Sequence, residues 1–191
     1  MTTPTSDEHP DAHDIIPRKN IRDAKGVQFV VSRLRGLGLS YLRGRCIVFK
    51  KLGKDQWSAP LFSSINSIGF GLTAGYDVIE TIAIMGTEEV LEKFKKGGPR
   101  FHVDLDVIAG RNSPVAQSGT DIPLVPYTIA GGALIDFSFK GGAATMDKKR
   151  NEATYGRSVT PAQVLDGQVE PPAEFEELYE LLNKLGHTHQ A

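Results

Sequence analysis

The chain has 191 residues, of which 40% are hydrophobic and 24% charged, and these values predict one domain of ordinary size with a real core. It has no apolar run long enough to span a bilayer, and we expect neither a signal peptide nor a lipid anchor. The single cysteine, Cys46, excludes an internal disulfide framework and favours a reducing compartment. Because Cys46 lies in an alternating run, we predict that it is a small buried apolar residue.

The net charge of −1 hides a strong asymmetry along the chain. Residues 18–54 contain eleven Lys and Arg residues and a single acidic residue, Asp23, whereas the other residues hold eleven bases against 22 acids. Such a separation predicts a face that attracts an anionic surface or polymer. The alternative is that these charges are scattered over several faces and paired with acids from elsewhere in the chain.

Taken in order, residues 1–14 are polar with two prolines and no apolar period, which predicts a disordered tail. A short helix is predicted from Pro17 to about Lys25, with Pro17 at its first position and Gly26 as its stop. Three strands are then expected at 27–31, 39–42 and 45–50, with a bend at Gly36 and Gly38 and a hairpin at Gly53.

Four arginines in this region recur at every second position. Wherever the backbone is extended, Arg33 shares a face with Arg35, and Arg43 shares a face with Arg45. Guanidinium groups suit phosphate oxygens, so these pairs predict a phosphate-binding patch. The structural alternative is a solvated sheet edge whose charges prevent aggregation.

Residues 56–77 contain the only tryptophan, Trp57, followed by Pro60 and a glycine-rich run. Pro60 is expected to end or kink the strand that carries Trp57. Glycines at positions 69, 71 and 75 fit either bent strands or a phosphate cradle, and the cradle requires a helix to open on them. The residues that follow, 76–84, are rich in β-formers, which favours bent strands.

The next part of the chain alternates strands and helices. We predict a strand at 78–85, then a helix that Thr87 caps and that 97–99 end. Residues 101–108 alternate most regularly, and Asp104 and Asp106 share their wet face. Two carboxylates so placed can bind a divalent metal, but no third ligand is evident, so we expect no metal site.

The C-terminal third is predicted to begin with a loop at 113–126, a strand at 134–140, a return strand at 143–146 and a charged turn at 147–151. The triplet 148–150 in that turn is either a solvated tip or a second part of an anionic-lipid site. Thr160 and Gln163 form a capping box that opens a short helix. The last helix, at about 173–185, has an apolar stripe that we expect to dock on the domain's own sheet; its members are Phe175, Leu178, Tyr179, Leu181, Leu182 and Leu185.

Several short motifs follow one another in a set order over residues 16–185. They are Trp57-Ser58-Ala59-Pro60, Gly69-Phe70-Gly71, Gly75-x-Asp77, Val78-Ile79, Lys96-Gly97-Gly98, Ala109-Gly110-Arg111-Asn112, Gly132-Ala133-Leu134, Lys140-Gly141-Gly142, Asp147, Asn151 and Tyr155-Gly156. In these motifs the chain resembles the SYLF domain, a lipid- and actin-associated domain of proteins in endocytosis and membrane traffic.

The pattern predicts an α+β fold, with a mainly antiparallel β sandwich or barrel-like core and three to four peripheral helices. We expect a single SYLF-like domain over residues 15–186, with tails at 1–14 and 187–191. No nucleophile elbow, paired-histidine zinc motif or P-loop is present, so we expect no enzyme, no cofactor and no metal.

The first functional hypothesis is a non-enzymatic peripheral membrane module that binds phosphoinositides or other anionic lipids. Clustered cations contribute about 1 kcal/mol each at an anionic leaflet. In some relatives an amphipathic helix inserts into the membrane, but residues 1–14 offer nothing to insert, so binding should be mainly electrostatic. The predicted lipid contacts are Arg33, Arg35, Arg43, Arg45, Lys50 and Lys51, with Lys148, Lys149 and Arg150 as a flank.

The alternative hypothesis, which the resemblance also implies, is a module that binds actin filaments or another cytoskeletal protein through the same basic segment. A third hypothesis is an enclosed apolar lipid pocket between sheet and helices. The expected location is cytoplasmic, peripheral on endosomal or plasma membrane or on cortical actin, with no nucleic-acid partner. The oligomeric state and the particular lipid stay open.

Overall fold

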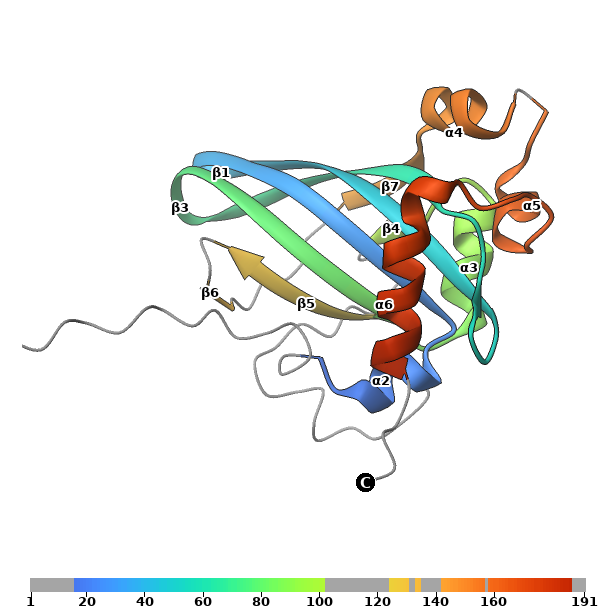
Figure 1. The fold of residues 1–191 in the computed structure, drawn as a ribbon. Coiled ribbons are helices and arrows are strands. Elements are labelled where there is room, and N and C mark those ends of the chain that lie inside the picture. The colour runs from blue at the N-terminus through green and yellow to red at the C-terminus, as the bar shows by residue number, and fades with distance from the viewer. Residues whose placement is uncertain (1–15, 102–123, 131–132, 135–141, 157, 187–191) are drawn as a thin grey trace, which may run out of the picture.

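A computed structural model describes residues 16–101, 124–130, 133–134, 142–156 and 158–186 (Figure 1). These residues form a seven-stranded antiparallel sheet with helices on its outside. The strands are β1 (Gly26–Gly53), β2 (Gln56–Trp57), β3 (Leu61–Met85), β4 (Arg100–Phe101), β5 (Val125–Ala130), β6 (Ala133–Leu134) and β7 (Gly142–Met146). The helices are α2 (Arg18–Asp23), α3 (Glu88–Lys95), α4 (Lys148–Tyr155), α5 (Pro161–Leu165), the 3-10 helix η1 (Ala173–Phe175) and α6 (Glu176–Gly186).

The centre of the fold is one very long hairpin. Strand β1 has 28 residues and β3 has 25, and they pair from Gly26 opposite Met85 to Val48 opposite Leu61, with one irregularity between Leu37 and Leu39. The C-terminal half of β3 pairs with β5, and its N-terminal half pairs with β7. The long hairpin therefore runs through the whole sheet, with β5 beside one half of β3 and β7 beside the other.

The hairpin is bent back on itself, as Figure 1 shows, so that the two halves of β1 meet. The amide of Lys51 donates to the carbonyl of Lys25 at 2.8 Å. Farther along, a Cβ placed on Gly44 would lie 2.6 Å from the Cβ of Ser32 and 2.9 Å from the carbonyl oxygen of Val31. Only glycine permits this approach of backbone to backbone. The result is a curled, barrel-like core, which confirms the predicted fold class.

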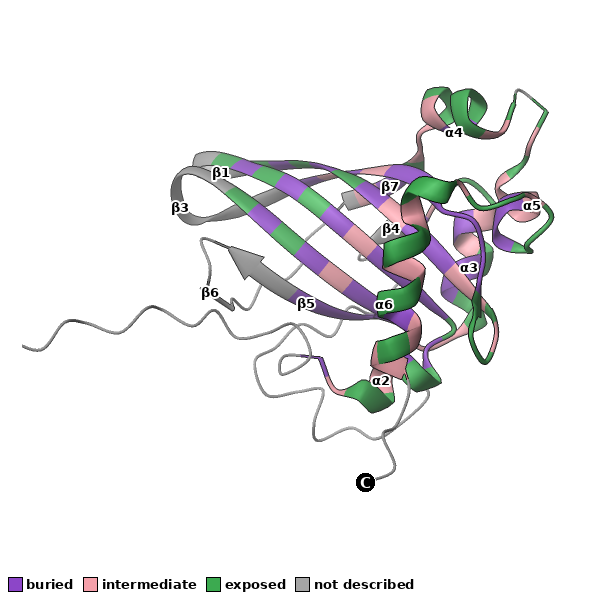
Figure 2. Ribbon diagram, viewed as in Figure 1, coloured by how far each residue is buried: buried purple, intermediate pink, exposed green. Residues whose placement is uncertain are grey.

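Side chains alternate between the inside and the outside of this curled sheet (Figure 2). One cluster fills the inside and is covered by α3 and α5. A second cluster lies on the outer face, where α2 and α6 cover the two ends of β1, represented by Val27 and Phe49. The ring of Phe49 makes edge-to-face contacts with Phe29 and Tyr179 at centroid distances of 6.0 and 5.6 Å. Between these ends, no described helix covers the outer face of β1 at residues 31–35 and 41–45.

Several predictions from the sequence are confirmed. Helix α3 has Thr87 at its N-cap and buries its apolar stripe, although the Thr87 hydroxyl makes no capping hydrogen bond. The capping box of Thr160 and Gln163 is present at α5. The stripe on η1 and α6 packs on the domain's own core, except for Leu181, which is exposed. Cys46 is buried, and burial raises the pKa of its thiol to about 12.

The glycine-rich run behaves as bent strand. Glycines 69, 71 and 75 lie within β3, so no helix opens on them and the phosphate-cradle alternative is wrong. The strands predicted at 27–31, 39–42 and 45–50 are in fact one strand, because the pairing with β3 continues past Gly36. Gly26 begins β1 instead of stopping the first helix, which ends at Asp23.

Two further predictions are wrong. Residues 147–151 begin helix α4, since the Asp147 carboxylate caps its N-terminus by accepting from the amide of Arg150 at 3.1 Å. The described part of the chain therefore has five α-helices where three to four were expected. Strand β5 begins at Val125, inside the predicted loop, because its backbone pairs with β3. The tails, Asp104, Asp106 and most of the strands predicted at 101–108 and 134–140 lie outside the described residues.

We expect Gly44→Ala to destabilise the domain by about 1–3 kcal/mol, because the new methyl group would overlap Ser32 and the Val31 carbonyl. Urea denaturation followed by circular dichroism measures this change. Gly186→Ala is the matched control, because no atom lies within 4 Å of its added Cβ, and it should stay within about 0.5 kcal/mol of wild type. Equal stability of the two variants would mean that the halves of β1 do not meet in solution.

Candidate functional site

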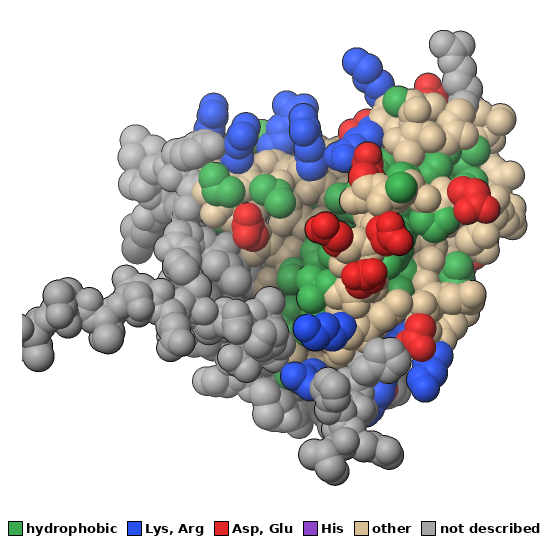
Figure 3. Space-filling model, in the orientation of Figure 1, with side chains coloured by type: hydrophobic (Ala, Val, Ile, Leu, Met, Phe, Trp, Pro, Cys, Tyr) green, Lys and Arg blue, Asp and Glu red, His purple; other side chains and the backbone are tan. Residues whose placement is uncertain are grey.

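Four arginines project from the part of β1 that no described helix covers. Arg33, Arg35, Arg43 and Arg45 occupy alternate positions, and all are exposed; we call them the arginine patch. The contact of Gly44 with Val31 and Ser32 places the second pair beside the first. Figure 3 shows Lys and Arg side chains standing in a row over β1. The predicted face-sharing within each pair is confirmed, and the bend of β1 joins the two pairs.

Three of the four arginines, Arg33, Arg43 and Arg45, have no ion-pair partner among the described residues. Their partners across the hairpin are uncharged, namely Val78, Asn66 and Ser64 in that order. Guanidinium groups that lack an internal partner remain available for carboxylate or phosphate oxygens.

Apolar side chains lie between these cations. Val31 is 54% exposed, Tyr41 46% and Val78 41%. The Tyr41 hydroxyl donates to Oδ1 of Asn66 at 3.1 Å, and this bond fixes the direction of the ring. The surface therefore combines charge with apolar area, as binding surfaces for proteins and lipids commonly do.

Helix α4 flanks the patch at its Arg45 end. The Asn151 side chain holds α4 to β3, since its Oδ1 accepts from the amide of Phe62 at 3.1 Å and its Nδ2 donates to the carbonyl of Phe62 at 2.7 Å. Phe62 lies opposite Ile47, two residues along β1 from Arg45. Three of the predicted site residues are thus brought to this end of the patch, namely Lys148, Lys149 and Arg150.

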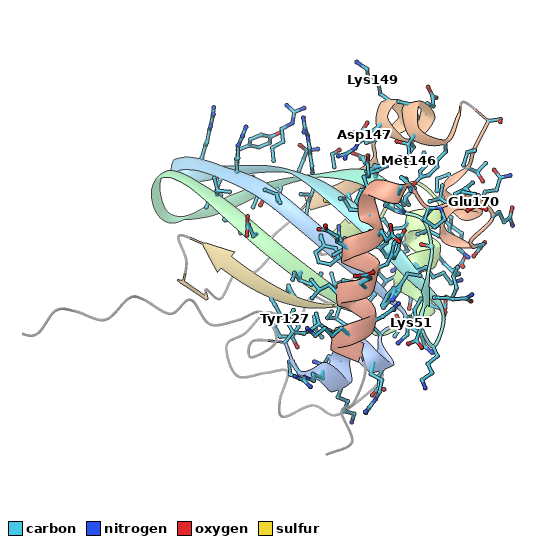
Figure 4. The ribbon with its side chains drawn as sticks, viewed as in Figure 1. Lys51, Tyr127, Met146, Asp147, Lys149 and Glu170 are labelled. Atoms are coloured by element: carbon cyan, nitrogen blue, oxygen red, sulfur yellow. The ribbon has the colours of Figure 1, made fainter. Side chains whose placement is uncertain are left out.

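The three residues of this flank are placed differently. Lys148 and Lys149 are exposed, and Lys149 points from α4 into solvent (Figure 4). The Arg150 guanidinium lies over the ring of Phe62, 4.1 Å from its centroid, so part of its surface is already used inside the domain.

The structure places Lys50 and Lys51 away from the arginine patch. The Lys50 ammonium pairs with Asp166 at 3.2 Å and with Glu88 at 3.5 Å, where β1 meets α3 and α5. Lys51 donates to the carbonyl of Arg22 at 2.7 Å and lies over the Trp57 ring at 5.5 Å. Burial lowers the pKa of Lys51. Both ammonium groups therefore hold parts of the domain together.

Asp166 is the centre of this ion-pair network. Its carboxylate also forms an ion pair with the Lys95 ammonium at 2.8 Å, and the same ammonium pairs with the Glu92 carboxylate at 2.7 Å. The hydrogen bond from Lys95 is the main cause that lowers the pKa of Asp166, and the same bond raises the pKa of Lys95. The network joins α3 to α5, so it stabilises the helices that cover the inner core.

Sequence reasoning located the arginine pairs but not their convergence. The available signal was Gly44, because a glycine in a strand interior marks a close backbone approach. Within the described residues, no group of three His, Cys, Asp or Glu side chains is placed to hold a metal ion. None of the helices in the described part is both long and apolar enough to cross a membrane.

In the described residues, the fold and this surface define a small, mainly antiparallel β-domain with a cationic face. Residues 66–185 match the family model Ysc84, described as "Las17-binding protein actin regulator". The chain therefore belongs to the Ysc84 family, which confirms the resemblance to the SYLF domain.

Named relatives agree with this assignment. The chain is 27% identical to the rat "SH3 domain-containing YSC84-like protein 1", with all of the chain and 57% of the relative covered. It is 26% identical to the human protein of the same name, of which it covers 56%. It is 24% identical to "LAS seventeen-binding protein 3" of Saccharomyces cerevisiae, with 90% of the chain and 39% of that protein covered. The chain thus spans little more than half the length of its animal relatives, and no solved structure matches it.

We expect Asp166→Asn to destabilise the domain by about 1 kcal/mol near neutral pH, because both lysines lose their shared carboxylate. A carboxyl with a lowered pKa in the folded state contributes stability above its unfolded pKa of about 3.9, and loses it as the pH falls further. The difference between wild type and variant should therefore shrink below about pH 4. Urea titrations from pH 3 to pH 7 measure it, and a difference that does not change with pH would contradict this role.

Proposed function

We propose that this domain is a cytoskeletal interaction module that binds actin filaments through the arginine patch. The observation that carries the proposal is the convergence of four exposed arginines on a face that no described helix covers, three of them without an ion pair among the described residues. The family description, which names an actin regulator, supports the same class of partner.

The physical basis is electrostatic complementarity. Actin filaments present acidic surfaces, and guanidinium groups form bidentate pairs with carboxylates. Clustered charges of one sign also raise the rate of encounter with an oppositely charged partner, more so at low salt. Val31 and Tyr41 would add apolar contact area between the ion pairs.

A second candidate function is binding to anionic phospholipids, including phosphoinositides. The specific observation is the flank on α4, where exposed Lys148 and Lys149 extend the arginine patch. Each cation near an anionic leaflet contributes about 1 kcal/mol. Exposed Val31, Tyr41 and Val78 would lie at the level of the headgroups. Either partner would bring the protein to the cell cortex or to endosomal membrane.

We expect the double variant Arg43→Glu/Arg45→Glu to lose at least tenfold in affinity for actin filaments, since four charge units change within the patch. Co-sedimentation with filaments at two salt concentrations measures this loss. The matched control is Arg18→Glu/Lys19→Glu on α2, which makes the same charge change on exposed residues of the same basic segment. Equal loss in both variants would show that only net charge matters and would contradict a specific filament site.

Filament binding and lipid binding are distinguished by comparing wild type with a lysine variant in filament and vesicle sedimentation. If filaments are the partner, the conservative variant Arg43→Lys/Arg45→Lys should weaken filament binding, because an ammonium cannot form the bidentate pair. An anionic bilayer should accept lysine nearly as well as arginine, because its attraction follows the charge. Wild type that sediments equally with neutral and phosphoinositide-doped vesicles at low salt would contradict the lipid candidate.

A further inference from the structure

The arginine patch and helix α6 are neighbours on the outside of the sheet. Arg45, Ile47 and Phe49 are alternate residues of β1, so they share its outer face. Helix α6 covers Phe49, since the Tyr179 ring packs edge-to-face on it at a centroid distance of 5.6 Å. Figure 3 shows the row of Lys and Arg side chains over β1 and the Asp and Glu side chains over α6 in one view. One side of the domain thus carries both surfaces.

The exposed side of α6 has the opposite charge to the arginine patch. Residues 173–186, which form η1 and α6, hold four glutamates and a single lysine, Lys184. All four glutamates are exposed, and none makes an ion pair with a residue that the structure describes. They are Glu174, Glu176, Glu177 and Glu180.

The needs of the helix itself do not account for all of this charge. Glu176 and Glu177 lie in the first turn of α6, where a carboxylate is stabilised by the helix dipole. Glu180 lies beyond that turn, and it follows Glu176 by four residues, a spacing at which like charges repel each other. A cationic partner would relieve this repulsion.

Apolar side chains accompany the charge on both surfaces. Leu181 is 46% exposed and follows Glu177 by four residues, so the two lie beside each other on α6. In the patch, Val31, Tyr41 and Val78 are exposed to a similar degree. Each surface therefore offers the other both opposite charge and apolar area, which a simple anion or cation does not.

Neighbouring surfaces of opposite charge make a face complementary to itself. A half turn of a second copy brings its anionic surface over the cationic surface of the first copy, and brings the first copy's anionic surface under its own cationic one. The same contact is then made twice, which favours a closed dimer over an open chain of copies.

We propose that two copies of this chain form a symmetric dimer in which α6 of each copy lies on the arginine patch of the other. Glu177 and Glu180 lie among the guanidinium groups, and Leu181 packs on the exposed apolar residues of the patch. The dimer does not depend on filament binding. Because the patch is also the proposed filament site, filaments would compete with the second copy, and this consequence alone rests on the proposed function.

Sedimentation velocity of the full chain, without filaments or lipid, tests the dimer. At low salt we expect the apparent mass to rise from the monomer value of 20.8 kDa towards twice that value, over concentrations up to about 0.5 mM. Association should weaken about fivefold between about 50 and about 300 mM salt. Arg43→Glu/Arg45→Glu and Glu177→Lys/Glu180→Lys should each weaken it about tenfold. The control Arg18→Glu/Lys19→Glu changes exposed residues on α2, outside both surfaces, and should dimerise like wild type.

A mixing experiment separates a specific dimer from attraction between net charges. The Glu177→Lys/Glu180→Lys chain, labelled at its N-terminus, should form a mixed dimer with the Arg43→Glu/Arg45→Glu chain, because both contacts then join opposite charges. With the Arg18→Glu/Lys19→Glu chain, which has the same net charge as the arginine variant, one of the two contacts repels, so the mixed dimer should be about tenfold weaker. Circular dichroism checks that each variant is folded.

Three results would overturn the proposal. They are a wild-type chain that stays monomeric at low salt, folded variants that stay monomeric when mixed, and equal mixed association with the α2 variant. Since no filament is present, each of these results leaves the proposed filament binding untouched. A wild-type chain that dimerises but does not sediment with filaments would contradict only the proposed function.

Discussion

The approach of β1 to itself at Gly44 is the contact on which the rest of the structure depends. A hairpin with strands of 28 and 25 residues is far longer than usual, and a flat ribbon of that length could not bury one face. Bending it back puts the even-numbered residues at 30–34 and 42–48 inside and leaves their odd-numbered neighbours outside. The bend is sharp enough that residue 44 must be glycine, because Ser32 and the carbonyl of Val31 occupy the space of a side chain.

That contact also decides where the charge is found. The basic segment, residues 18–54, consists almost entirely of α2 and β1. The path of β1 therefore determines the position of most of its cations. The bend gathers the arginines in the middle of β1, where none of the described helices covers the sheet. At the far end of the strand, Lys50 and Lys51 meet α3, α5 and α2, and become partners for Asp166 and for a backbone carbonyl. The arginines in the middle of β1 therefore form a patch, as the first alternative predicts. Lys50 and Lys51 at its end are paired within the domain, as the second alternative predicts.

How far the sequence predicts this fold depends on whether a feature is local. The helix over 88–95, the capping box at Thr160 and the stripe on the last helix follow from period, caps and composition, and all are present. Helix α4 was not predicted, because its residues carry almost no apolar stripe and it is held by Asn151, whose partners lie on β3. The continuity of β1 past Gly36 was missed for the same reason, since it depends on pairing with a strand some 40 residues away. The arginine pairs followed from a period of two, but their meeting required the bend.

A groove of about 540 Å³ beside Trp57, between the turn that follows β1 and the segment that follows α5, could not be found from the sequence, because its walls come from segments more than 100 residues apart. What joins them is a set of side-chain hydrogen bonds from α6 to β2 and the residues next to it, made by Asn183 and Tyr179. The same helix buries the Trp57 ring, which is only 6% exposed.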